Sequence, residues 1–193
     1  MLLPASIPKR LTFLPATLVL FPLSVVSVNA QSKLTNQSKV FINGMGPVRV
    51  GMTVAEASRA AGTRLVALGD RGDGSCFYVK PQGQPNDFGF MVINGRISRV
   101  DIIKGGVTTL KGAKIGDTEA RIKSLYPGQI KVTPHKYTNG HYLTFVPKDR
   151  SDRNYRVVFE TDGDREACCG ATYRVTQFRS GKLPEVEWVE GCS

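Results

Sequence analysis

The chain is poor in the residues that build metal centres and active sites. Its 193 residues include two histidines and one tryptophan. The sequence contains no G-x-S-x-G nucleophile motif, no H-E-x-x-H zinc motif and no P-loop. The composition, 41% hydrophobic and 22% charged, is that of a folded globular protein, and it excludes collagen-like, disordered and multi-span membrane chains. We therefore expect a non-catalytic protein with no catalytic residue, no cofactor and no metal site.

Acidic residues are absent before Glu56. A Lys-Arg pair at 9–10 precedes an apolar run over 11–28, and the small residues of Val28-Asn29-Ala30 form a cleavage site. Two prolines inside the run disfavour the alternative, a membrane-spanning helix. The pattern predicts a signal peptide over residues 1–30, cleaved after Ala30, and a secreted or periplasmic protein. Cleavage leaves 163 residues and lowers the net charge from +10 to +8.

A short sequence motif occurs twice in the remaining chain. The segment V-R-V-G-M-T-V-A-E-A over residues 48–57 is similar to A-K-I-G-D-T-E-A-R-I over 113–122, and both contain Gly-x-Thr-x-Ala. Such self-similarity indicates a repeated structural unit.

Both copies have the pattern of a helix start. Thr53 is a natural N-cap, and Glu56 three residues later completes a capping box. Thr118 repeats the cap without the box. Gly62 and Pro127 end the two apolar-periodic segments. The sequence therefore predicts two short helices, of about three turns at most.

Strand-like segments follow each helix. Asn94-Gly95, Asn139-Gly140 and Asp162-Gly163 predict tight hairpin turns. The expected strands cover residues 74–80, 88–93 and 96–103 in the first unit and 130–137, 141–146, 154–160, 173–179 and 185–189 in the second.

Together these elements predict an α+β fold, a tandem repeat of a short helix plus an antiparallel β-meander. The signal peptide over 1–30 is followed by a flexible polar lead-in over 31–43. The first helix-plus-sheet repeat covers 44–110, and the second covers 111–193.

The first motif, Gly51-Met52-Thr53-Val54-Ala55-Glu56-Ala57, is similar to the G-M-T-x-x-E-V/A signature of SmpA/OmlA-type outer-membrane assembly lipoproteins. A tandem of such units resembles the fold of the secreted β-lactamase inhibitor proteins. This resemblance implies two units whose sheets form a shared curved face for binding. It also implies a protein-binding or envelope-assembly role rather than catalysis.

Four cysteines in an exported chain indicate disulfide bonds. A bridge between the adjacent Cys168 and Cys169 would be strained. We expect a disulfide between Cys76 and Cys192, because the long loop that it closes constrains the unfolded chain most. The alternative is that Cys168 and Cys169 each take one distant partner.

The two histidines are expected to lie apart. A tight turn at Asn139-Gly140 would place His135 and His141 on opposite faces of its hairpin, which argues against a shared metal ion. One alternative function remains open here, a small exported enzyme in which His135, Tyr137 and Tyr142 line a cleft over the sheet.

Positive charge is concentrated between Arg96 and Lys136, where nine basic residues face three acidic ones. Such a surface attracts acidic partners, anionic glycans or lipid head groups. No aromatic stacking platform accompanies it, so we expect no nucleic-acid partner. The candidate binding residues are Arg96, Arg99, Lys104, Lys111, Lys114, Arg121, Lys123, Lys131, Lys136, Tyr137, Tyr142 and Trp188.

The resulting hypothesis is an exported, non-catalytic protein-binding module that uses a sheet face, either as an inhibitor or as an envelope-assembly accessory. The expected partner is a protein of the cell envelope. A structural envelope protein that binds an anionic glycan or lipid surface through its basic segment is a further alternative.

Overall fold

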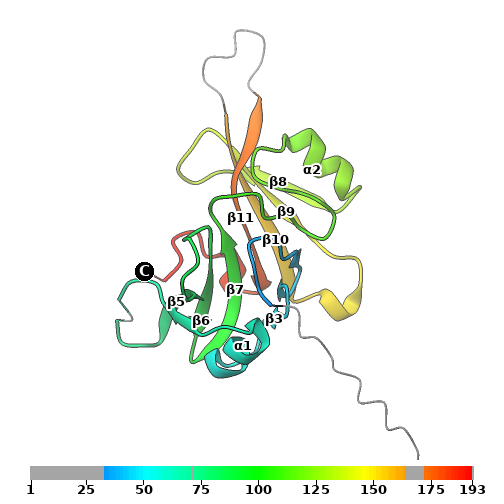
Figure 1. Cartoon of the computed structure of the whole chain (residues 1–193). Helices are drawn as coiled ribbons and strands as arrows, with labels where there is room; N and C mark the ends of the chain where they lie inside the picture. Colours follow the sequence, from blue (N-terminus) through cyan, green and yellow to red (C-terminus); the bar gives the residue numbers. More distant parts are fainter. Residues whose placement is uncertain (1–32, 71, 164–171, 193) are drawn as a thin grey trace, which may run out of the picture. The chain divides into compact units, whose positions relative to one another are not determined.

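The computed structural model describes residues 33–70, 72–163 and 172–192. Within these ranges the chain forms two antiparallel sheets, of three and eight strands, and two short α-helices (Figure 1). The predicted signal peptide over 1–30 lies outside the described residues, as do Cys168 and Cys169.

The helices are α1 (Val54–Ala61) and α2 (Glu119–Leu125). The small sheet consists of β1 (Val40–Phe41), β2 (Gly44–Met45) and β3 (Val48–Arg49). The large sheet consists of β4 (Leu65–Ala67), β5 (Cys76–Pro81), β6 (Phe88–Ile93), β7 (Arg96–Ile102), β8 (Ile130–Pro134), β9 (His141–Phe145), β10 (Tyr155–Gly163) and β11 (Tyr173–Lys182).

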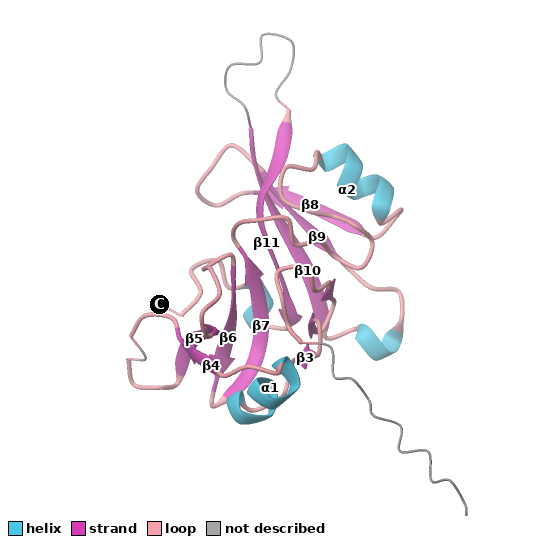
Figure 2. Ribbon diagram, viewed as in Figure 1, coloured by secondary structure: helices cyan, strands magenta, loops and turns pink. Residues whose placement is uncertain are grey.

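The large sheet runs in the order β4-β5-β6-β7-β11-β10-β9-β8 (Figure 2). Its two halves meet where β7 pairs with β11, with Val100 opposite Ser180 and Ile102 opposite Phe178. Strands from both halves of the chain therefore share one continuous hydrogen-bonded ladder.

This architecture shows that the expected α+β fold, a tandem repeat of helix plus meander, is wrong. The described chain is mainly β, with 40% strand and 14% helix. The helices have only eight and seven residues, and the strands of the two expected units join through β7 and β11 into one sheet. Hydrogen bonding between strands, rather than two helix-centred units, organises the fold.

The two helix starts form as predicted. The Thr53 side chain accepts a hydrogen bond from the Glu56 backbone N–H, and the Glu56 carboxylate accepts one from the Thr53 backbone N–H at 2.8 Å, which is a capping box. Thr118 caps α2 by accepting from the Arg121 backbone N–H, without a box. Gly62 ends α1 with a φ of 64°, a conformation that glycine adopts without strain.

The predicted turns had mixed outcomes. Asn94 and Gly95 have φ of 49° and 75°, as a type I′ turn requires, so this hairpin is confirmed. The tight turn at Asn139-Gly140 is wrong, because β8 ends at Pro134 and β9 begins only at His141. The intervening loop is held instead by hydrogen bonds to the His135 ring, described below.

The strand expected over 185–189 is also wrong, since Glu185–Glu187 forms a 3₁₀ turn. Pro184 has no N–H to donate to a ladder. The carbonyl groups of this segment bond to arginine side chains rather than to a neighbouring strand.

The hydrophobic core lies on one face of the large sheet, beneath the helices and the small sheet. Its largest buried side chains include Phe88, Phe90, Phe159 and Phe178. Ala57 and Ala61 of α1 and Ile122 of α2 pack into the same cluster.

The polar segment expected as a flexible lead-in also contributes to this core. In its described part, from residue 33, Leu34 is fully buried and Val40 is 1% exposed. Val40 also exchanges backbone hydrogen bonds with Thr108 and Leu110. The segment is therefore packed into the fold from Leu34 onward.

Candidate functional site

The outer face of the large sheet, opposite the helices, carries charged side chains at its centre. Two β-bulges bring them there, because Ser98 in β7 and Thr176 in β11 are extra residues relative to the strands that they pair with. A bulge shifts the alternation of a strand by one residue. Arg99 and Arg179 therefore face outward, although Ile97, two residues before Arg99, lies in the core.

Glu160 of β10 is the centre of a buried polar cluster. It is 3% exposed and accepts hydrogen bonds from the Arg179 guanidinium, from Gln177 Nε2 at 2.6 Å and from His135 Nε2 at 3.2 Å. Charged side chains are tolerated inside a protein when they are paired and hydrogen-bonded in this way. The Glu160 carboxylate therefore already accepts hydrogen bonds from three side chains of the protein.

His135 is held neutral by its surroundings. Its Nδ1 accepts the backbone N–H groups of Tyr137 and Thr138, each at 3.1 Å. The proton therefore sits on Nε2, which donates to Glu160. Burial lowers the pKa of the imidazole, the negative charge of Asp162 opposes this effect, and the positive charge of Arg179 adds to it. Both ring nitrogens form hydrogen bonds within the protein, so His135 holds the loop between β8 and β9 in place.

Arg99 is the centre of a second cluster on the same face. Its guanidinium contacts the Asp101 carboxylate at 2.9 Å and donates to the Tyr78 hydroxyl at 2.8 Å. Burial raises the pKa of the Tyr78 hydroxyl to about 12, and it also raises the pKa of the Asp101 carboxyl, an effect that Arg99 opposes. Arg99 also donates to the carbonyls of Glu185 and Trp188, at 2.8 and 2.6 Å.

Those carbonyls belong to the C-terminal tail, residues 183–192, which crosses the outer face. Arg179 Nε donates to the Val186 carbonyl at 2.6 Å, and Val186 is fully buried. At its far end the tail is fixed by a disulfide between Cys76 and Cys192, whose Cα atoms are 5.4 Å apart. The predicted pairing of these two cysteines is confirmed.

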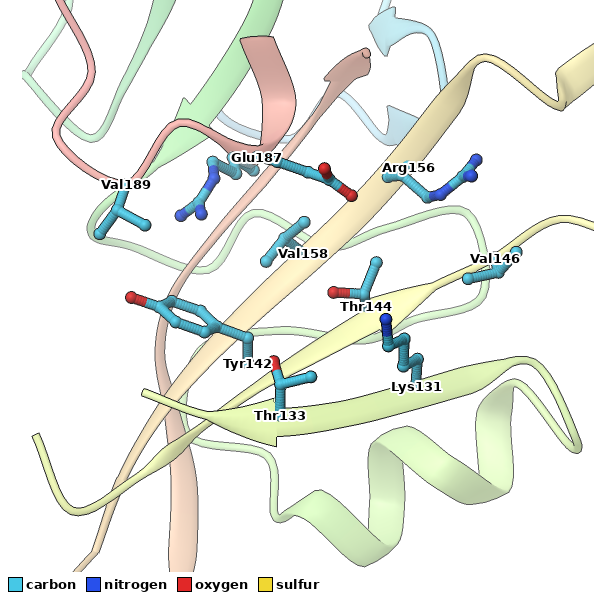
Figure 3. Close-up of a pocket in the computed structure, with 10 residues that line it drawn as sticks. Lys131, Thr133, Tyr142, Thr144, Val146, Arg156, Val158, Glu187 and Val189 are labelled. Atoms are coloured by element: carbon cyan, nitrogen blue, oxygen red, sulfur yellow. The ribbon is translucent and has the colours of Figure 1, made fainter. Parts of the chain in front are cut away.

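Beside the tail lies a cavity of about 300 Å³, which we call the basic pocket (Figure 3). One row of cross-strand neighbours forms its floor, running from Lys131 through Thr144 and Val158 to Arg179. The residues that line it are Lys131, Thr133, Tyr142, Thr144, Val146, Arg156, Val158, Arg179, Glu187 and Val189.

The pocket combines positive charge with hydroxyl groups. Among the described residues, neither Lys131 nor Arg156 forms an ion pair. Burial and the like charge of Arg99 lower the pKa of the Arg179 guanidinium to about 10, so this group stays protonated at neutral pH. Among the described residues of the lining, Glu187 is the only acidic one. The arrangement suits a ligand group that carries negative charge.

Two further cavities adjoin Val189 of the tail, with volumes of about 410 and 320 Å³. The first is lined by Trp188, Lys136 and the disulfide, and the second by Tyr78, Arg99 and Asp101. Val189 lines both of them and the basic pocket as well. Val189 of the tail therefore lies where the three cavities adjoin.

Half of the binding residues predicted from the sequence lie at this tail-covered face. They are Arg99 beneath the tail, Lys131 and Tyr142 in the basic pocket, Trp188 in the tail itself, and Lys136 and Tyr137 beside Glu190. Lys136 contacts Glu190 at 3.0 Å, and the hydrogen bonds from Lys136 and Tyr137 lower the pKa of the Glu190 carboxyl.

The other predicted residues are dispersed. Arg96 bonds to the Gly51 carbonyl, Lys104 and Lys114 are exposed outside helices and strands, and Arg121 and Lys123 lie on α2. Lys111 lines an apolar cavity of about 510 Å³, next to Leu110 and Tyr126.

Sequence reasoning missed Arg156, Arg179, Glu160 and Thr133 at this face. Arg156 and Arg179 lie outside the basic segment that drew attention to the other cations. A signal was present in β10 and β11, where Phe159-Glu160 and Phe178-Arg179 each place a charge directly after a core aromatic. Period-two alternation puts such a charge on the opposite face of the sheet.

No group of three or more His, Cys, Asp or Glu in the described part of the chain has a geometry that would hold a metal ion. Within the same part, no helix is long and apolar enough to cross a membrane.

Comparison with known proteins gives no family. No protein-family model and no curated protein matches the chain. Among solved structures, the chain is similar to the uncharacterized protein yfeY from Escherichia coli, with a TM-score of 0.49 and 16% sequence identity. The likeness covers 75% of this chain and 99% of that one.

Proposed function

We propose that this protein is an exported, non-catalytic binding module whose outer sheet face holds an acidic segment of a protein partner in the cell envelope. The observation that carries the proposal is the basic pocket. There, Lys131 and Arg156 have no ionic partner among the described residues, and the backbone of three strands holds their side chains over one cavity. Preorganised cations of this kind favour acidic partners and raise their rate of association.

Two sequence features support the compartment. The first 30 residues have the layout of a signal peptide, and a disulfide such as Cys76–Cys192 persists in oxidising surroundings. The similarity of residues 51–57 to the SmpA/OmlA signature supports a role in the envelope.

The test compares two double variants with the same change in net charge. In Lys131→Gln/Arg156→Gln the basic pocket loses both unpaired cations, whereas Lys104→Gln/Arg121→Gln removes two exposed cations outside the outer face. After chemical crosslinking in the envelope fraction, we expect the first variant to lose the captured partner and the second to retain it.

Salt gives a second readout of the same contact. Capture by the unaltered protein is expected to fall as ionic strength rises, because exposed charge pairs are screened. Equal capture by both double variants, or capture that salt does not affect, would refute the proposal.

A further inference from the structure

The C-terminal tail has the chemistry that the outer face is suited to bind. Glu185, Glu187 and Glu190 alternate with apolar residues in it, and no basic residue occurs from 183 to 192. Beneath and beside it are cations on four elements: Arg99 on β7, Arg179 on β11, and Arg156 and Lys131 at the basic pocket. The tail is thus an acidic segment of this chain, with one 3₁₀ turn at Glu185–Glu187, that lies on a basic surface.

The tail is held very differently along its length. Its proximal part, 183–188, is held by three carbonyl groups that accept from Arg99 and Arg179, and by the buried side chain of Val186. Its distal part, 189–192, has the disulfide at Cys192 and the exposed contacts that the Glu190 carboxylate makes with Lys136 and the Tyr137 hydroxyl. Exposed ion pairs contribute little, so the disulfide is the main restraint on the distal part.

The distal part of the tail also lies between the cavities of the outer face. Val189 lines the basic pocket and the two cavities of about 410 and 320 Å³. Gly191 passes so close to Tyr78 that an added Cβ would lie 2.9 Å from the hydroxyl oxygen, and its φ is 72°. Displacing residues 189–192 joins the three cavities and uncovers the Tyr78 side of the face.

We propose that residues 189–192 are a latch, closed by the Cys76–Cys192 disulfide, over a groove that accepts an acidic, extended segment of the partner in place of the distal tail. This inference rests on the proposed function and adds its regulation, because the latch competes for the surface that the partner uses.

Opening the latch is a two-electron exchange. A dithiol reductant attacks the disulfide, which takes up two electrons and two protons to give the thiols of Cys76 and Cys192, and the reductant becomes a disulfide. Cys76 and Cys192 both line the open cavity of about 410 Å³ beside Trp188, so a reductant has a route to the bond.

Closure acts through effective concentration. While the bond is intact, the distal tail is confined near its seat and excludes a competing segment at a high local concentration. Once the bond is cut, the disulfide no longer confines residues 189–192, although the proximal tail remains held by Arg99 and Arg179.

The single tryptophan of the chain provides the first measurement. Trp188 adjoins the latch and is 40% exposed. With Cys168 and Cys169 replaced by serine, only Cys76 and Cys192 respond to a dithiol. We expect reduction, and likewise Cys192→Ser, to increase iodide quenching of Trp188 fluorescence while far-UV circular dichroism stays unchanged.

The second measurement uses a fluorescein-labelled peptide with the sequence of residues 183–192 and serine at its last position. We expect it to bind the reduced chain and Cys192→Ser about tenfold or more tighter than the oxidised chain. A peptide with its three glutamates replaced by glutamine is expected to bind neither form. Lys123→Gln, which removes an ion pair on α2, is the control and should leave the affinities unchanged.

A third measurement avoids variants that fail to fold. Because binding and opening are linked, the peptide must shift the thiol–disulfide equilibrium of the otherwise unaltered chain toward the reduced form by the same factor. Equal affinity for the oxidised and opened chains, absence of binding to the opened chain, or no shift of this equilibrium would each overturn the latch. If the acidic peptide binds both forms equally and Lys131→Gln/Arg156→Gln abolishes that binding, the proposed function stands and only the latch fails.

Discussion

The two faces of the large sheet are buried by different means. The helix side is covered by an apolar cluster in which the rings of Phe159 and Phe178 lie 5.5 Å apart. On the outer face, Glu160 and Arg179, the residues that directly follow those two phenylalanines, are as deeply buried, but as a hydrogen-bonded ion pair beneath the tail. Neighbouring residues of the same strands are thus buried in two different ways, one by apolar contacts and the other by an ion pair.

The difference shows what each face can do. Apolar contacts are non-directional, so losing one atom group leaves a void but no unsatisfied charge. The outer face depends on complete pairing, because each buried charge is costly when its partner is removed. A surface of this kind requires a covering segment whose polar groups pair with its charges, and here that segment is the acidic tail.

Substituting consecutive residues of β11 tests the comparison most strongly. We expect Phe178→Ala and Arg179→Ala each to lower the free energy of unfolding by about 3–5 kcal/mol, the first by forming a cavity and the second by leaving Glu160 unpaired. Adding Glu160→Gln to Arg179→Ala should recover part of the loss, whereas adding Phe159→Ala to Phe178→Ala should deepen it. Urea unfolding measures the free energy of unfolding of each single and double variant. If the losses from Arg179→Ala and Glu160→Gln simply add, the two faces do not differ in the way proposed.

Removing the disulfide tests how far the cover stabilises the face beneath it. The bond closes a loop with a sequence separation of 116 residues, so Cys76→Ala/Cys192→Ala is expected to lower the free energy of unfolding by about 2–5 kcal/mol. Thermal unfolding with and without a dithiol measures the same quantity. An unchanged midpoint would show that the arginine contacts alone hold the tail.

Acid should weaken the outer face through His135. The lowered pKa of this imidazole means that the unfolded chain takes up a proton near pH 6.5, its ordinary value, while the folded chain does so only at lower pH. In that window the unfolded state binds more protons, so stability falls as the pH drops below about 6.5. Urea unfolding at a series of pH values measures how the free energy of unfolding changes with pH. His135→Gln should reduce this pH dependence below about pH 6.5, and an unchanged dependence would show that other groups cause it.

The smallest effect is expected at the rim. Lys136 is paired with Glu190 and bonded to Tyr137, and these contacts raise the pKa of its ammonium group. The group is nevertheless exposed, and exposed pairs contribute little. Lys136→Gln should therefore leave the urea midpoint unchanged within error. A clearly lower midpoint would show that the exposed Lys136–Glu190 pair stabilises the fold as the buried ion pairs do.

Local sequence rules predicted the local structure. Thr53 and Thr118 begin helices, and Asn94-Gly95 forms its turn. Each of these features depends on residues with a strong conformational preference, independent of the rest of the fold.

The assembly of the sheet and site was not predictable in the same way. The bulges at Ser98 and Thr176 reverse the alternation of their strands, and neither residue marks a bulge by its type. Arg99 was therefore predicted as a binding residue of the basic segment, although it is 2% exposed and lies beneath the tail. Pairing of β7 with β11 depends on contacts distant in sequence, which no local pattern encodes.

The disulfide also imposes an order of events on the newly made chain. Cys192 follows Cys76 by 116 residues, so at about 5–20 residues per second it emerges roughly 6–23 s later. Cys168 and Cys169 emerge before it. Cys76 therefore meets two competing thiols before its native partner exists, and correct pairing requires either that Cys76 stay reduced during this interval or that an early bond be exchanged. The rate of maturation is then set by thiol chemistry, and a disulfide isomerase would accelerate it.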